Sequence, residues 1–219
     1  MQMGLVNELQ NAIDTDETGA LLRRAYRVAA KLQRTEIAEW LSNEQNGYGP
    51  GAVPDFRVLN GTLHYRTNGY IPAGFGMAKN GAFSMPPMKG IDCSQMPIRE
   101  PIAQVIEQIT AVKSGHLITM QLSADINRSL RKLFHSEFFP EIIEQFTFEV
   151  HLDPAKLTAI PSRIRDLLLR WACDLETAGV LGEGMSMTDR EKDLAKQVVF
   201  NINNCTIEQL SDSGLNWKR

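Results

Sequence analysis

IPSRIRDLLLRWACDLETAGVLGEGMSMTDREK, residues 160–192, is the stretch that organises the predicted fold. Its first half places apolar residues at helical spacing on one face and mostly charged residues on the other. The apolar positions are Ile164, Leu167, Leu168, Trp171, Ala172 and Leu175. Pro161 or Ser162 can begin this helix, because proline is favoured at the first helical position and serine at the cap. We therefore predict a helix from about residue 161, with Trp171 as a core anchor.

The second half of this stretch predicts a glycine hinge followed by another helix. Gly179 can adopt the left-handed conformation that ends many helices, and Gly182 and Gly184 let the chain reverse. Thr188 and Glu191 have the spacing of a capping box, in which each residue satisfies a backbone N–H group of the other. We interpret these residues as hinge and cap positions, and they indicate architecture without bond-making chemistry.

Length, composition and charge favour an ordinary globular protein with one domain. The chain has 219 residues, 43% hydrophobic and 22% charged, which is typical of one well-cored domain. The net charge of −3 gives no overall attraction to nucleic acid or anionic lipid. The N-terminus has no basic leader before an apolar core, and no apolar run is long enough to span a bilayer. We expect a cytoplasmic protein without a membrane partner.

The cysteines support the same location. Cys93, Cys173 and Cys205 are odd in number, far apart and outside any CxxC pair, so they predict neither a disulfide framework nor a zinc site. Cys173 lies next to Trp171 in the predicted helix, and we interpret it as a small packing residue.

We expect one domain over residues 1–210, in which residues 1–47 are helical. The second of the three helices predicted there has a basic face. Two interpretations stay open for this face: a contact with an anion or nucleic acid, or a solvated surface paired with acidic neighbours. The face consists of Arg23, Arg24, Arg27 and Lys31.

Residues 48–96 are predicted to be irregular, because glycine and proline occur every few residues. Asn60-Gly61 is the dipeptide that best accepts a type I′ turn, and residues 56–59 and 62–66 flank it. We predict a small hairpin there. The following loop, residues 67–96, could be a lid, a mobile segment or a binding surface.

Residues 97–153 are predicted to mix helix and strand, and residues 154–200 to be helical. A helix from Pro97 to Gly115 would bury Ile98, Ile102, Val105, Ile106 and Ile109. A helix capped by Ser123 would bury Ile126, Leu130, Leu133 and Phe134. Strands at 116–122 and 145–152 could pair in either direction. The fold class is therefore α+β and mainly helical, and residues 211–219 are predicted to form a mobile tail.

Two motifs together resemble a known family. The first is WLSNEQNGYGPGAVPDFR at residues 40–57, preceded by LLRRAYRVAAKL, and the second is IRDLLLRWACDLETAGVLGEGMSMTDREK at residues 164–192. Both resemble the AbiTii domain family, which is found near bacterial abortive-infection and other phage-defence genes. The resemblance implies a defence-associated role in the bacterial cytoplasm, and it carries over no catalytic residue or ligand. The structural signature consists of Trp40, Gly47, Pro54, Trp171, Gly179, Gly182 and Gly184.

The first motif also suggests a polar cluster. Glu44 lies one turn beyond Trp40, and Tyr48 and Arg57 bracket a segment rich in glycine and proline. In a functional interpretation, Arg57 binds a phosphate or carboxylate and Tyr48 contacts the same ligand. In a structural interpretation, Glu44 and Arg57 pair to hold the loop on the helix. We favour the structural interpretation.

No common catalytic motif is present, so the catalytic residues stay unknown. His64, His116, His135 and His151 are dispersed, but His116 and His151 lie on the two predicted strands, which pairing could bring close. A carboxylate and lysine group of the kind found in nucleases can be assembled from Asp55, Glu149, Asp153 and Lys156, although its spacing is permissive. We expect no cofactor and no metal site.

Three hypotheses follow for function. The leading one is a phage-defence interaction or effector module that acts through a protein partner or an anionic ligand. The first alternative is a toxic enzyme, a nuclease or nucleotide hydrolase, with its site near Tyr48 and Arg57 or on the strands that carry histidines. The second alternative is a nucleic-acid-binding module, which the net charge does not indicate. We expect a protein partner within a defence system, and the chain could also form a homo-oligomer.

Overall fold

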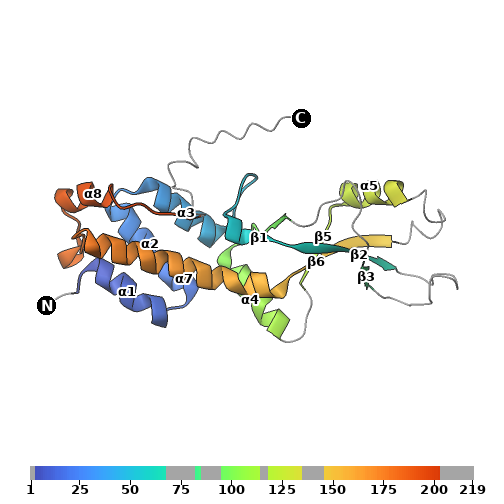
Figure 1. Ribbon diagram of the computed structural model, residues 1–219, viewed down its shortest axis with the longest axis horizontal. Helices are drawn as coiled ribbons and strands as arrows, with labels where there is room; N and C mark the ends of the chain where they lie inside the picture. Colours follow the sequence, from blue (N-terminus) through green and yellow to red (C-terminus); the bar gives the residue numbers. More distant parts are fainter. Residues whose placement is uncertain (1–2, 68–81, 85–94, 114–117, 135–145, 203–219) are drawn as a thin grey trace. The chain divides into compact units, whose positions relative to one another are not determined.

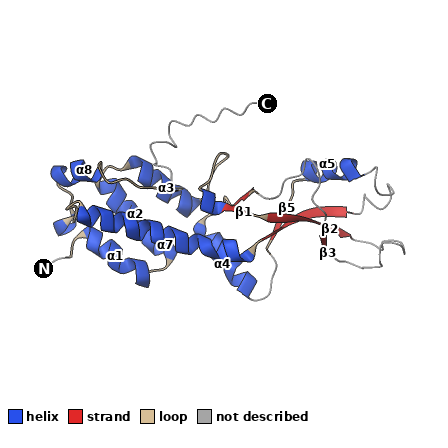
Figure 2. Ribbon diagram, viewed as in Figure 1, coloured by secondary structure: helices blue, strands red, loops and turns tan. Residues whose placement is uncertain are grey.

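The computed structural model describes residues 3–67, 82–84, 95–113, 118–134 and 146–202 (Figure 1). The chain is α+β and mainly helical, as predicted (Figure 2). It divides into two compact units. Unit 1 comprises Met1–Arg57, Ile98–Glu107 and Thr158–Arg219, and unit 2 comprises Val58–Pro97 and Gln108–Leu157. The loop at residues 67–96 lies mostly outside the described residues, and the predicted tail at 211–219 lies entirely outside them.

The helices and strands follow the chain in this order. The helices are α1 (Leu5–Thr15), α2 (Thr18–Lys31), α3 (Thr35–Asn46), α4 (Ile102–Lys113), α5 (Ala124–Phe134), α7 (Pro154–Thr177) and α8 (Asp189–Ala195), with short 3₁₀ turns at Asp55–Arg57 and Glu183–Met185. The strands are β1 (Val58–Leu59), β2 (Gly61–Thr67), β3 (Ala82–Ser84), β4 (Met96–Pro97), β5 (Thr119–Gln121) and β6 (Phe146–Leu152).

Unit 1 is held together by the apolar faces of its helices. The two tryptophans of the signature pack against the same ring: the ring centroid of Phe200 lies 5.1 Å from that of Trp40 and 5.8 Å from that of Trp171. All three aromatic side chains are buried. Each such side chain contributes roughly 1.5–3 kcal/mol by leaving water, so this aromatic cluster joins α3, α7 and the C-terminal segment strongly.

Helix α7 is longer than predicted. It begins at Pro154, where the Asp153 carboxylate accepts a hydrogen bond from the Ala155 N–H group at 2.9 Å. Pro161 therefore lies inside the helix, and the prediction that it opens the helix was wrong. An internal proline removes a backbone hydrogen bond and costs about 3 kcal/mol. The neighbouring Leu157 and Ile160 are fully buried, and their burial offsets that cost.

The end of α7 is a complete Schellman motif. Gly179 has a φ of +81°, and its N–H group donates to the Glu176 carbonyl at 2.9 Å. The Val180 N–H group donates to the Leu175 carbonyl, also at 2.9 Å. These two bonds satisfy the carbonyls that a helix end leaves open. Gly182 continues the turn with a φ of +67°.

Glu191 stabilises the glycine hinge after α7 through hydrogen bonds to its backbone. One carboxylate oxygen accepts hydrogen bonds from the N–H groups of Leu181 and Gly182, and the other accepts from the Thr188 N–H and hydroxyl groups. The predicted capping box at the start of α8 is confirmed. Burial raises the pKa of Glu191, but these hydrogen bonds outweigh it and lower the pKa to about 2.

Replacing Glu191 with glutamine is expected to lower the free energy of unfolding by about 1–2 kcal/mol at neutral pH, because a capping carboxylate is lost. The folded pKa of about 2 lies below the ordinary 4.5. The stabilisation is therefore present above pH 4.5 and is lost as the pH falls toward 2. Urea unfolding should show the gap between wild type and variant closing over that range. Glu183→Gln, an exposed change in the same hinge, is the control, and a gap that does not depend on pH would contradict the assignment.

Unit 2 is built on an antiparallel sheet of order β3-β2-β6-β5. β2 pairs with β6 over its whole length, from Gly61 opposite Leu152 to Thr67 opposite Phe146. The two predicted strands, now β5 and β6, are antiparallel. The predicted hairpin was wrong, because β1 pairs with β4 and not with β2. Among the described residues Asn60 and Gly61 do not have the positive φ angles that a type I′ turn requires.

Helix α5 covers the part of β6 that β5 does not reach. The Asn127 amide oxygen accepts a hydrogen bond from the Phe148 N–H group at 2.8 Å, and the Arg131 guanidinium donates to the Phe146 carbonyl at 3.0 Å. Side chains thus satisfy a strand edge that would otherwise be open to pairing with another chain. Consequently Asn127 is buried, whereas Ile126 and Leu133 are exposed, so their predicted burial was wrong.

Three further expectations need correction. Helix α4 begins at Ile102, because Pro97 is part of β4 and Pro101 accepts the first helical hydrogen bonds. Ile106 is 36% exposed on the outer face of α4. Cys173, expected as a packing residue, is exposed on α7.

In the described part of the chain, no helix combines the length and apolar character needed to cross a membrane.

Candidate functional site

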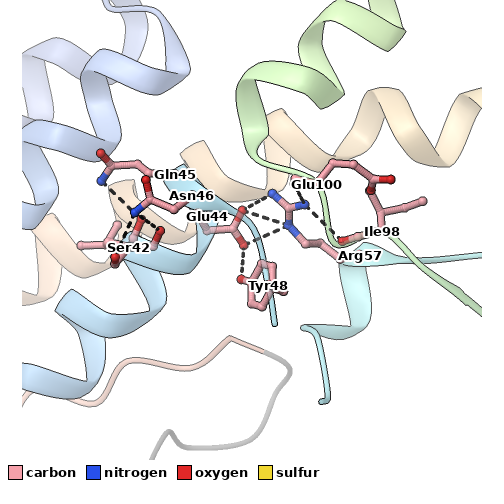
Figure 3. A network of polar contacts seen from close by, with 9 residues as sticks. Ser42, Glu44, Gln45, Asn46, Tyr48, Arg57, Ile98 and Glu100 are labelled. Carbon is pink, nitrogen blue, oxygen red and sulfur yellow. Dashed lines mark hydrogen bonds and ion pairs between the residues drawn. The ribbon is translucent and has the colours of Figure 1, made fainter. Parts of the chain in front are cut away.

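The predicted polar cluster of the first motif is a buried ion pair in unit 1 (Figure 3). The Arg57 Nη2 and Nε atoms donate to Glu44 Oε2 at 2.5 and 3.0 Å, and both side chains are fully buried. Arg57 Nη1 donates to the backbone carbonyls of Ile98 and Glu100 at 3.2 and 2.8 Å. The guanidinium therefore ties α3, the turn at Asp55–Arg57 and the segment before α4 together.

Tyr48 completes this cluster. Its hydroxyl group donates to Glu44 Oε1 at 2.6 Å, and its ring centroid lies 5.1 Å from the Arg57 guanidinium carbon. Burial and the neighbouring Glu44 carboxylate raise the pKa of the Tyr48 phenol, so it stays a neutral donor. The carboxylate thus receives hydrogen bonds from two side chains and is held away from water.

Backbone contacts reinforce the cluster on the side of the loop. The Tyr48 N–H group donates to the Arg99 carbonyl at 2.8 Å. The Arg99 guanidinium returns two bonds, to the carbonyls of Gly49 and Gly51, each at 2.6 Å. Figure 3 shows the Glu44 carboxylate facing the Arg57 guanidinium, which also contacts the carbonyl groups of Ile98 and Glu100. Glu44 and Arg57 pair as the structural interpretation describes, whereas the Tyr48 hydroxyl group donates to Glu44 and not to a backbone carbonyl.

The basic face of α2 is partly engaged within the protein. Arg24 forms an ion pair with Asp16 at 2.6 Å, and Lys31 donates to the Met185 carbonyl. Arg23 and Arg27 are exposed. Two of the four cations therefore have partners in unit 1, which reduces the charge that this face offers to an anion.

A second polar cluster, which the sequence interpretation did not assemble, lies on one face of the unit 2 sheet. We call it the histidine face, and it consists of His64, Arg66, Gln121, Glu149 and His151. The rings of His64 and His151 are stacked, with centroids 3.8 Å apart and an interplanar angle of 13°. The predicted approach of His116 to His151 stays a prediction, because His116 lies outside the described residues, as does His135.

Glu149 is the centre of the histidine face. It is only 2% exposed, and Oε1 contacts His151 Nε2 at 2.8 Å and accepts a bond from Arg66 Nη2 at 3.2 Å. Gln121 Nε2 reaches Oε2 at 3.5 Å. Burial alone would raise the pKa of this carboxyl, but the bonds from His151 and Arg66 prevail and lower it. Glu149 is therefore an anion at neutral pH.

The other groups of this face differ in exposure and charge. The Arg66 side chain is 52% exposed, whereas His151 is 15% exposed. Burial and the nearby His151 lower the pKa of His64, although Glu149 acts in the opposite direction. The His64 Nδ1 atom is buried without a hydrogen-bond partner. A half-exposed cation beside a buried acid and a pair of imidazoles is an arrangement more typical of functional sites than of packing.

The residues proposed as a nuclease-like group have separate roles. Glu149 belongs to the histidine face, and Asp153 caps α7. Among the described residues no group of three or more His, Cys, Asp or Glu side chains could hold a metal ion. Glu149 and His151 are two residues apart on β6, so their side chains lie on the same face of the sheet. The register of β2 against β6 is needed to place His64 and Arg66 on that face as well.

Fold and sites together define a mainly helical α+β protein with a buried ion pair in one unit and a polar sheet face in the other. The AbiTii family model matches residues 4–200. The chain belongs to the AbiTii family, and membership associates it with abortive infection and phage defence in bacteria. No curated protein and no solved structure matches the chain.

Proposed function

We propose that this chain is an effector module of an abortive-infection system, acting in the bacterial cytoplasm by binding an anionic ligand on the histidine face. The observation that carries the proposal is the half-exposed Arg66 beside the stacked histidines. Family membership supports the defence role. The Glu44 and Arg57 pair is a less suitable ligand site, because both side chains are fully buried and bind each other.

The exposed part of the Arg66 guanidinium supports an anionic ligand. Arg66 and the Glu149 carboxylate offset each other in charge, so the ligand would be held by hydrogen bonds from the guanidinium and not by a net positive charge of the face. Arg66 contacts Glu149 through Nη2, and the planar guanidinium has five N–H donors in total. A phosphate or carboxylate can therefore bind the exposed side of the fork while Glu149 holds the other side.

The proposal is tested in bacteria that carry the complete defence locus. Arg66→Gln is expected to weaken ligand binding about tenfold or more, since a charged hydrogen bond is worth about 1.5–3 kcal/mol. Phage plating on these cells should rise toward the level seen without the locus. Arg128→Gln is the matched control, because Arg128 is an exposed arginine of the same unit, paired with an aspartate on α5. Undiminished protection by a folded Arg66→Gln protein would refute the role of this face.

A further inference from the structure

We infer that the histidine face is also a proton-transfer site, with His151 as the base and an RNA phosphodiester as the substrate. This inference rests on the proposed function, because the phosphate is the anion that Arg66 would bind. Its basis is geometric: a buried carboxylate contacts an imidazole nitrogen at 2.8 Å, and a half-exposed cation binds the same carboxylate oxygen. A base oriented by a third group is the usual arrangement in acid–base catalysis.

The contact with Glu149 decides which nitrogen of His151 can accept a proton. An anionic carboxylate accepts hydrogen bonds and donates none, so the Nε2 atom at 2.8 Å must carry the hydrogen. In a neutral imidazole the lone pair then lies on Nδ1. His151 Nδ1 is therefore the basic atom, and Glu149 is a positioning residue that stabilises the imidazolium once His151 is protonated.

The stacked partner, His64, is a weaker base than an ordinary histidine. Burial and the nearby His151, whose ring lies parallel to it at a centroid distance of 3.8 Å, lower the pKa of His64. Among the described residues, the charged or titratable groups that face the pair are Glu149 on β6 and Arg66 on β2, while β5 contributes the neutral Gln121.

A site with one base and one cation can cleave an RNA phosphodiester, because the adjacent 2′-hydroxyl group of the RNA is the nucleophile. His151 Nδ1 takes the proton of the 2′-hydroxyl group, and the 2′-oxygen forms a bond to phosphorus. The bond from phosphorus to the 5′-oxygen breaks, and that oxygen takes a proton from water. The hydroxide produced accepts the proton from His151. The products are a 2′,3′-cyclic phosphate end and a 5′-hydroxyl end, and no oxidant, reductant or other reactant is consumed.

The test uses the purified full-length chain, a fluorescent single-stranded RNA and the DNA of the same sequence. We expect cleavage of RNA to cyclic phosphate ends, binding without cleavage for DNA, and weaker binding of both by Arg66→Gln. His151→Ala should slow cleavage by about 10²-fold or more, a typical contribution of a general base, while Arg128→Gln should cleave normally. Glu149→Gln should cleave more slowly and shift the acidic limb of the pH profile downward, because a neutral amide does not stabilise the imidazolium that forms when His151 takes the proton.

The outcomes separate the two proposals. Binding of both nucleic acids without RNA cleavage would overturn the proton-transfer inference and leave anion binding intact. Absence of binding to either would overturn the RNA inference, while the phage-plating test of Arg66→Gln decides the anion-binding proposal separately. Cleavage unaffected by His151→Ala would assign the activity to another protein or site. A ¹H–¹⁵N spectrum of the wild-type histidines gives a test that needs no variant: the inference requires the hydrogen of neutral His151 on Nε2, and a hydrogen on Nδ1 would refute it.

Discussion

Replacing Glu44 with alanine is expected to lower the free energy of unfolding by about 3–5 kcal/mol, because it leaves the Arg57 guanidinium buried without its counter-ion. Both side chains are fully buried, so water cannot replace the lost partner. Arg57→Ala should cost a similar amount, since it also leaves the carbonyls of Ile98 and Glu100 without their donor. Such a loss is a large part of the 5–15 kcal/mol that typically separates folded from unfolded domains. Chemical unfolding of each variant provides the measurement.

The paired replacement Glu44→Met with Arg57→Met is the control. It separates the cost of leaving one buried charge unpaired from the cost of lost side-chain packing. It removes both charges and keeps much of the volume, so it should cost clearly less than the sum of the two single changes. Tyr48→Phe should cost about 1–2 kcal/mol, because one hydrogen bond to the carboxylate is lost. If each single change cost under about 1 kcal/mol, or if the paired change were additive, the cluster would not be the tie between α3 and its loop that we describe.

The same comparison bears on function. A defect in defence caused by Glu44→Ala should follow the loss of folded protein and should be reduced in the paired variant. A defect caused by Arg66→Gln should appear in a protein of near-normal stability, since the Arg66 side chain is half exposed and Glu149 keeps its contact with His151. The two clusters can thus be distinguished by whether the loss of protection follows the loss of stability.

Features set by neighbouring residues could be predicted from the sequence. The capping box of Thr188 and Glu191 and the stripe that contains Leu167 and Trp171 depend on contacts within a few residues. Helices α1, α2 and α3 lie within residues 1–47, which the sequence predicts to be helical. In each case the local pattern and the tertiary environment require the same conformation, so local reasoning was sufficient.

Features set by distant partners could not be predicted. Asn60-Gly61 has the best local composition for a hairpin, but β2 instead gains a full-length pairing with β6, which outweighs a two-residue turn. Helix α5 has apolar residues at helical spacing, yet it turns Asn127 inward because the edge of β6 needs hydrogen bonds. The histidine face needs the strand register itself, since a shift of one residue would move His64 to the other side of the sheet.

Gly47→Ala is expected to be the most damaging small substitution in the first motif, with a loss of roughly 2–4 kcal/mol in the free energy of unfolding. Gly47 ends α3 with a φ of +93° and a ψ of 162°, a combination that is almost restricted to glycine. A Cβ atom there would lie 2.9 Å from the Arg99 carbonyl oxygen, which is backbone and cannot turn aside.

The same carbonyl accepts the hydrogen bond from Tyr48, so relieving the clash would also disturb the Tyr48 contact with Glu44. Gly49→Ala is a matched control two residues away, because a Cβ atom at Gly49 has no neighbour within 4 Å and its φ is not positive. That change should shift stability by about 0.5 kcal/mol or less. Equal effects of the two substitutions in urea unfolding would mean that the close approach at Gly47 does not fix the loop, and the buried ion pair alone would then have to hold it in place.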